Sequence, residues 1–154
     1  MNISHNLDYI HHITGLRAVS AAGYKGTYKA YPKPVEVEDT AAGVMRLSNG
    51  GIMQVTALSA FPLNYSDVTV ITGKSGVVRQ DDDILSLFLN EPYGDYAVGR
   101  WNTVAYEDGG NAYSDYFDAW ADMQKNGGGV PVSGEDALYV LNLIQKIYCF
   151  EELC

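Results

Sequence analysis

A series of short, strand-like runs joined by tight turns constrains the fold of this chain more than any other feature. The clearest turn is Ser48-Asn49-Gly50-Gly51, whose residues suit the positive backbone angles of a hairpin. A second turn, Gly73-Lys74-Ser75-Gly76, separates two further β-branched runs. Because hairpins join antiparallel neighbours, these turns predict a mostly antiparallel sheet. The expected strands span residues 17–24, 35–47, 52–60, 67–72, 77–80, 84–89 and 103–106.

Helical patterns flank the strand runs on both sides. Residues 3–14 carry apolar side chains at helical spacing, with Ser4 as the expected N-cap and Gly15 as the C-terminal stop. A second helix is expected where Tyr113, Phe117 and Trp120 form an aromatic stripe. Glycines at 127–129 should end it.

The last predicted helix spans 134–153 and is capped by Ser133. Its expected apolar face consists of Ala137, Leu141, Ile144 and Tyr148, and Cys149 is expected in the core. The order of elements predicts an α+β fold, with an open, mostly antiparallel six- to seven-stranded sheet and helices packed on one face. We expect residues 1–154 to form a single domain, because that length can bury its own core.

The charge balance excludes several function classes. Ten basic against 19 acidic residues give a net charge of −9, which argues against binding nucleic acid or an anionic membrane. No run approaches the ~20 apolar residues of a membrane span. Residues 1–8 lack the pattern of a signal peptide. Cys149 and Cys154 fit neither a disulfide scaffold nor a zinc pattern, so we expect a cytoplasmic protein.

Nucleotide-binding motifs are missing from the sequence. Gly73-Lys74-Ser75 imitates the end of a phosphate-binding loop, but Val68 stands where that loop needs its first glycine. No GxGxxG motif follows a strand-like run. Glu36 and Glu38 are interpreted as the solvated edge of a strand.

Three polar residues share one stripe of the first predicted helix. His5, Asp8 and His12 have the spacing i, i+3, i+7, whereas His11 lies off the stripe and is expected to be structural. A histidine beside a carboxylate can exchange protons near neutral pH. The same trio could ligate a metal ion. It could also be a solvated polar face, and the pattern alone leaves these three alternatives open.

Four stretches in register give the chain a specific resemblance. They are Ser4-His5-Asn6-Leu7-Asp8 with Gly15, residues 35–51, residues 70–76, and residues 131–138 with Ile147-Tyr148. Together they resemble the C-terminal domain of the Gfo/Idh/MocA (glucose–fructose oxidoreductase/inositol dehydrogenase) family.

The resemblance implies a role for particular residues. In the family a preceding Rossmann domain binds NAD or NADP and supplies a lysine, and the C-terminal sheet forms the floor of a sugar or polyol site. His5 matches the family's proton-transferring histidine, and Asp8 matches an aspartate beside the substrate. Tyr65 would match a substrate-facing tyrosine of some members, and His12 joins them as a substrate-binding candidate. The sheet commonly forms the subunit interface, which implies a homodimer or a higher homo-oligomer.

This sequence departs from the family pattern in two ways. The Rossmann half and its lysine are missing, and Met1 stands where many members have an aspartate. An excised domain, a split gene or a truncated frame would each explain this. We therefore expect no cofactor site and no dehydrogenase activity in the chain by itself. The competing interpretation is a stand-alone sugar-binding or protein-interaction module, with a metal hydrolase as a third alternative.

Overall fold

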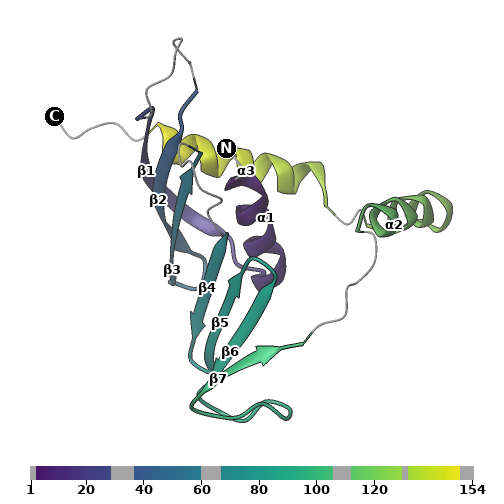
Figure 1. The fold of residues 1–154 in the computed structure, drawn as a ribbon. Coiled ribbons are helices and arrows are strands. Elements are labelled where there is room, and N and C mark those ends of the chain that lie inside the picture. Colours follow the sequence, from purple (N-terminus) through teal and green to yellow (C-terminus); the bar gives the residue numbers. More distant parts are fainter. Residues whose placement is uncertain (1–2, 29–36, 60–66, 106–111, 130–131, 150–154) are drawn as a thin grey trace. The chain divides into compact units, whose positions relative to one another are not determined.

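The computed structural model describes residues 3–28, 37–59, 67–105, 112–129 and 132–149 (Figure 1). Three helices and seven strands lie in these ranges, and the predicted α+β class is confirmed. In chain order the elements are α1 (Ile3–Thr14), β1 (Ala18–Gly26), β2 (Thr40–Leu47), β3 (Ile52–Leu58), β4 (Val68–Gly73), β5 (Gly76–Asp81), β6 (Ile84–Leu89), β7 (Trp101–Val104), α2 (Ala112–Asn126) and α3 (Gly134–Tyr148).

The described strands form two hydrogen-bonded sheets, where one sheet was expected. The first sheet has the order β1-β2-β3 and the second the order β4-β5-β6-β7, and every neighbouring pair is antiparallel. The chain correspondingly divides into two compact units, Met1–Pro62 with Asp115–Cys154 and Leu63–Ser114. Turn sequences identify which strands are joined by hairpins, but they contain no signal for pairing across a longer connection.

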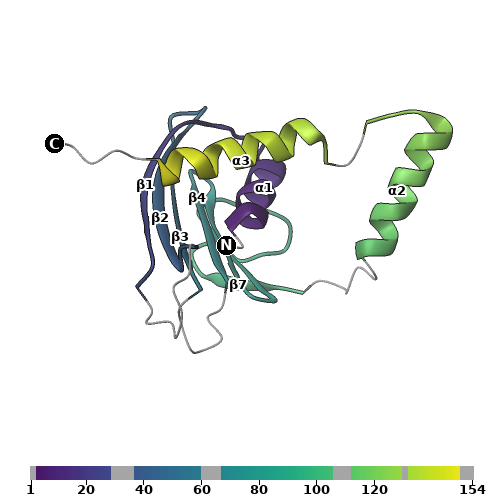
Figure 2. The ribbon, with the colours of Figure 1, turned by 90° about the horizontal axis from the view of Figure 1, so that it is seen from above.

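In the first unit, the β1-β2-β3 sheet is covered by α1 and α3 on one face (Figures 1 and 2). Along β2, Ala41, Gly43 and Met45 are buried and the residues between them are exposed, as the two-residue period of a strand requires. The core that closes this layer consists of Ile3, Leu7, Met45, Val140, Leu143 and Ile147.

Helix α3 begins with the predicted cap but buries a different face. The Ser133 hydroxyl accepts a hydrogen bond from the Asp136 backbone N–H at 3.1 Å, and the Asp136 carboxylate accepts one from the Ser133 backbone N–H at 3.3 Å. Of the predicted face, Ile144 and Tyr148 are partly buried, but Ala137 and Leu141 are exposed. Cys149, predicted in the core, is exposed as well. Apolar residues lie on several sides of α3, so periodicity alone did not select the buried one.

Two glycines allow α3 to approach the sheet closely. Gly23 and Gly43 lie opposite each other in the β1-β2 pair. A Cβ atom on Gly43 would lie 2.9 Å from Ile147 Cγ1, and one on Gly23 would lie 2.3 Å from the Ala42 carbonyl oxygen and 2.6 Å from Ile147 Cγ2. The side chain of Ile147 therefore occupies space that only glycines leave free.

Glu38 and Asp39, just before β2, form hydrogen bonds that connect the first sheet to neighbouring segments. Asp39 is buried and accepts hydrogen bonds from the Tyr28 backbone N–H at 3.0 Å and the Thr40 hydroxyl at 3.0 Å. The interpretation of Glu38 as a solvated edge is wrong, because Glu38 accepts a hydrogen bond from the Tyr148 hydroxyl at the end of α3. Glu36 lies outside the described residues. The ammonium of Lys25 lies 4.4 Å from the centroid of the Tyr148 ring.

The Glu38–Tyr148 hydrogen bond shifts both titrations. The bond from Tyr148 lowers the pKa of the Glu38 carboxyl, because it favours the ionised form. Burial, followed by the same hydrogen bond, raises the pKa of Tyr148 to about 12. The neutral phenol and the ionised carboxylate are therefore the partners that stabilise the fold.

The second unit is a meander of four strands. As predicted, a turn joins β4 to β5, and Gly76 lies so close to β6 that a Cβ atom there would lie 2.1 Å from the Phe88 carbonyl oxygen. Asp82, in the turn between β5 and β6, has a positive φ of 48°.

No helix in the described ranges is long and apolar enough to cross a membrane.

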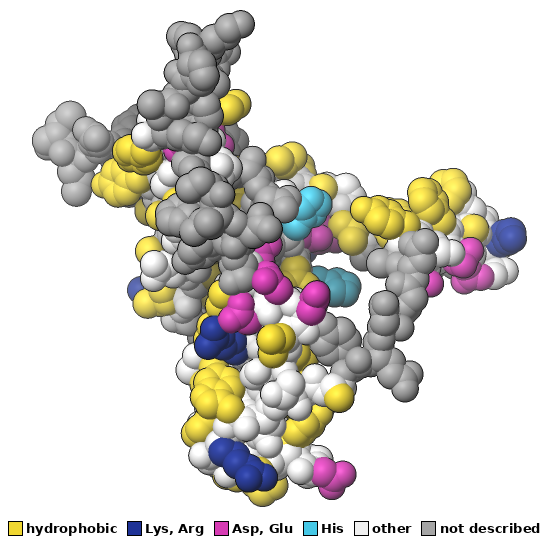
Figure 3. All heavy atoms as spheres, viewed as in Figure 1, with side chains coloured by type: hydrophobic (Ala, Val, Ile, Leu, Met, Phe, Trp, Pro, Cys, Tyr) yellow, Lys and Arg dark blue, Asp and Glu magenta, His cyan; other side chains and the backbone are white. Residues whose placement is uncertain are grey.

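Helix α2 carries the predicted aromatic stripe, and Gly127, with a φ of 75°, follows its last turn. Tyr113, Phe117 and Trp120 are exposed. Hydrophobic side chains gather along one side of α2 and acidic ones along the other (Figure 3).

The close approach of α3 predicts a coupled stability effect. We expect Gly43→Ala to lower the free energy of unfolding by about 1–3 kcal/mol, the usual cost of overpacking a core. In an Ile147→Ala background this cost should nearly vanish, because the three atoms nearest to the new methyl group belong to the Ile147 side chain and are gone. Gly23→Ala is the matched control and should stay costly in both backgrounds, since its clash with the Ala42 carbonyl remains. Urea unfolding measures all of these variants, and an unchanged cost of Gly43→Ala would contradict the packing.

The raised pKa of Tyr148 predicts a loss of stability in alkali. Tyr148→Phe should lower the free energy of unfolding by about 1 kcal/mol at pH 8, because a hydrogen bond to a carboxylate is lost. The folded-state pKa of about 12 exceeds the unfolded value of 10.0, so this contribution is complete below pH 10 and disappears as the pH rises through 12. Urea unfolding of both proteins between pH 8 and 11.5 checks this. A difference that does not change with pH would show that the phenol's ionisation does not matter.

Candidate functional site

Helix α1 positions the predicted polar stripe. It begins at Ile3, so Ser4 lies inside the helix, and its prediction as the N-cap is wrong. Ile3 and Leu7 anchor one face in the core. Gly15 ends the helix as predicted, with a φ of 65° and its N–H donating to the His11 carbonyl oxygen at 2.9 Å. The remaining faces of α1 are thereby held in a fixed orientation.

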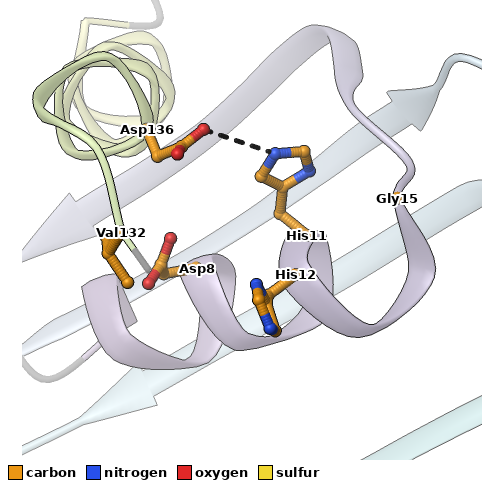
Figure 4. A pocket seen from close by; sticks show the side chains of 6 residues that line it. All are labelled: Asp8, His11, His12, Gly15, Val132 and Asp136. Carbon is orange, nitrogen blue, oxygen red and sulfur yellow. Dashed lines mark ion pairs between the residues drawn. The ribbon is translucent and has the colours of Figure 1, made fainter. Parts of the chain in front are cut away.

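A hollow of about 180 Å³ lies beside α1 (Figure 4). Its lining residues are Asp8, His11, His12, Gly15, Val132 and Asp136. Asp8 and His12 come from successive turns along one side of α1, and Asp136 comes from the first turn of α3. All of these residues belong to the first unit.

The structure brings together two of the four predicted site residues. Asp8 is half-buried and His12 is exposed, and neither has a hydrogen bond or ion pair with another described residue. His5 is exposed on α1 and does not line the hollow. Tyr65 lies outside the described residues. The polar atoms of Asp8 and His12 are thus left for a ligand or for water.

His11 also lines the hollow, and its ring contacts residues outside α1. Its Nδ1 lies 3.1 Å from the Leu16 carbonyl oxygen, and its ring centroid lies 5.2 Å from that of Tyr139 on α3. Its Nε2 lies 3.8 Å from the Asp136 carboxylate (Figure 4). These contacts fit the structural role expected for His11, although the sequence did not place it in the site.

Asp136 is the lining residue that sequence reasoning missed. Arg17 donates to its carboxylate at 2.9 Å, and the same guanidinium lies 4.6 Å from the centroid of the Tyr139 ring. Hydrogen bonds from the hydroxyl and backbone N–H of Ser133, supported by Arg17, lower the pKa of Asp136. The pattern Ser133-x-x-Asp136 could have identified it as a capping residue. Its contact with Arg17, 119 residues away, has no local signal.

The metal interpretation finds no geometric support. Within the described ranges, no three histidine, cysteine, aspartate or glutamate side chains come close enough together to hold a metal ion. The side chains of the hollow offer hydrogen bonding and proton exchange. A carboxylate can accept hydrogen bonds from hydroxyl groups, and an imidazole can donate, accept or exchange a proton.

Solved structures of similar fold were found for nearly the whole chain. UDP-N-acetylglucosamine 3-dehydrogenase GnnA from Acidithiobacillus ferrooxidans matches with a TM-score of 0.73 and 16% identity, covering 96% of this chain and 46% of that one. An aldose-aldose oxidoreductase from Caulobacter crescentus, solved with glycerol, matches with a TM-score of 0.75 and 18% identity, covering 92% and 41%. WlbA dehydrogenase from Bordetella pertussis, solved with NADH and UDP-GlcNAcA, matches with a TM-score of 0.65 and 18% identity, covering 95% and 40%.

These likenesses establish the fold, and the chain spans less than half the length of each of these structures. A search of the curated proteins found no match. The family model described as "Oxidoreductase family, C-terminal alpha/beta domain" matches residues 1–149. The chain therefore belongs to the Gfo/Idh/MocA oxidoreductase family, of which it forms the C-terminal alpha/beta domain.

Proposed function

We propose that this chain is the substrate-binding and dimerisation domain of an NAD(P)-dependent sugar or polyol oxidoreductase. The observation that carries the proposal is the hollow beside α1, where Asp8 and His12 face a ligand-sized space without protein partners. The family membership supports it, because the helix that lines the hollow carries the resemblance to the family's histidine–aspartate motif.

The chain's own residues supply the substrate side of the reaction. His5, on the same helix, exchanges the proton of the reacting hydroxyl group. Asp8 accepts a hydrogen bond from a neighbouring substrate hydroxyl, and His12 lies one turn further along. Together these side chains orient a polyhydroxylated molecule rather than cleave it.

We propose that the nicotinamide cofactor is bound outside the described part of this chain. All the described strands pair with antiparallel neighbours, so they provide none of the strand–loop–helix crossovers that cradle a pyrophosphate. A separate nucleotide-binding domain would hold the cofactor, NAD or NADP, which would supply the hydride-transfer chemistry. The chain by itself should therefore bind the substrate but not oxidise it.

The outer face of the first sheet is the proposed subunit interface. Tyr24, Val44, Ile52 and Leu58 lie on the face opposite the helices, and all are exposed, Val44 by 53% and Ile52 by 77%. Large apolar side chains that stay exposed on one face of a sheet favour association. A two-fold axis would place the same patch of each copy against the other.

Substrate binding can be tested with the isolated chain. Titrating ¹⁵N-labelled protein with myo-inositol or glucose should shift amide signals around Asp8, His12 and Gly15, while added NAD or NADP gives no turnover. His12→Ala should weaken the response but change the free energy of unfolding by no more than about 0.5 kcal/mol, since its side chain is exposed. Shifts scattered over the surface, or none with any polyol, would refute the proposed site.

The interface can be tested by sedimentation. The wild-type chain should sediment as a dimer or a larger oligomer at micromolar concentration, and Val44→Glu should dissociate it, because the change buries a charge in the interface. Leu141→Glu is the matched control, since Leu141 is similarly exposed, by 60%, but lies on α3. A monomeric wild-type chain, or equal dissociation by both substitutions, would overturn the proposed interface.

A further inference from the structure

Apart from its two histidines, the ionisable side chains that line the hollow are acidic. Asp8 and Asp136 contribute carboxylates, and no lysine or arginine is among the residues that line it. The hydrogen bonds from Ser133 lower the pKa of Asp136, because they favour its ionised form. A ligand entering the hollow therefore meets negative charge.

The nearest cation is already engaged. Arg17, at the start of β1, directs its guanidinium to Asp136 at 2.9 Å and lies over the Tyr139 ring. Asp136 is thereby partly neutralised, but Asp8 has no basic partner in the described part of the chain. The net effect at the hollow is an uncompensated carboxylate on α1.

An uncompensated carboxylate discriminates between ligands by charge. Neutral hydroxyl groups donate to it, and an ammonium group adds a charge-assisted hydrogen bond. A second carboxylate or a phosphate would face it without a counter-ion and would have to give up its own hydration. The hollow therefore both attracts hydroxyl donors and repels anions.

We infer that the part of the substrate that enters this hollow is a neutral or amino sugar or polyol, and that Asp8 excludes uronic acids and phosphorylated sugars. This inference rests on the proposed function and specifies the substrate class of the same site. Two unit charges about 6 Å apart change an affinity by about threefold at the dielectric constant of water, and by about a hundredfold at the effective value of about 20 that is typical near a protein surface. We expect glucuronate to bind more weakly than glucose by a factor within that range.

The experiment compares glucose, glucosamine and glucuronate in NMR titrations of the ¹⁵N-labelled chain at pH 7. Glucosamine should bind at least as tightly as glucose, and glucuronate more weakly. Asp8→Asn should reduce the difference between glucuronate and glucose to less than twofold. Asp118→Asn is the matched control, because it makes the same change in net charge on α2, away from the lining residues, and it should leave the difference intact.

A salt series on the wild-type chain provides a test that needs no variant. The difference between glucose and glucuronate should shrink as the salt rises from 20 mM to 0.5 M, because salt screens the repulsion. If no sugar binds under any condition, the proposed function fails. If glucose binds but glucuronate binds equally well, or Asp118→Asn acts like Asp8→Asn, the charge selection is refuted and the proposed site survives.

Discussion

The packing of Ile147 onto two facing glycines is the contact on which the first unit depends. Because Gly23 and Gly43 have no side chains, α3 approaches β1 and β2 closely enough for Ile147 to be almost fully buried. This contact fixes which side of α3 faces the sheet. Val140 and Leu143 follow onto the same side and meet Ile3 and Leu7 from α1 in a single core. The packing of α3 on the sheet therefore also sets the orientation of α1 and of its polar stripe.

The first turn of α3 contributes Asp136, which connects the elements around the hollow. Asp136 caps its own helix through Ser133, holds Arg17 at the start of β1, and lies 3.8 Å from His11 on α1. One carboxylate thus links three elements around the hollow. Because its hydrogen bonds with Ser133 are made at the start of α3, the Asp136 carboxylate is held in one orientation beside the hollow. His11 is held from two sides, which leaves Asp8 and His12 as the lining side chains available to a ligand.

Much of this arrangement could be predicted where the cause is local. The bounds of α1, the glycine that ends it, the cap of α3 and the hairpin turns all follow from residues within a few positions of one another. The buried face of α3 could not be predicted in this way. Val140 and Leu141 are both apolar, and only the glycines of the distant sheet decide which of the two is buried. The bond from Tyr148 to Glu38 spans 110 residues, and no local pattern announces it.

In the candidate site, too, the local features could be predicted from the sequence and the long-range ones could not. The spacing of His5, Asp8 and His12 correctly indicated a shared helix, but helical spacing does not say which of them a neighbouring element will enclose. Val132, just before α3, and Asp136, in its first turn, line the hollow together with Asp8 and His12, whereas His5 does not. A proton-transferring group must meet the cofactor's reacting partner as well as the substrate. Under the proposed function, an exposed His5 outside the hollow is therefore the arrangement expected if the cofactor's groups come from another domain.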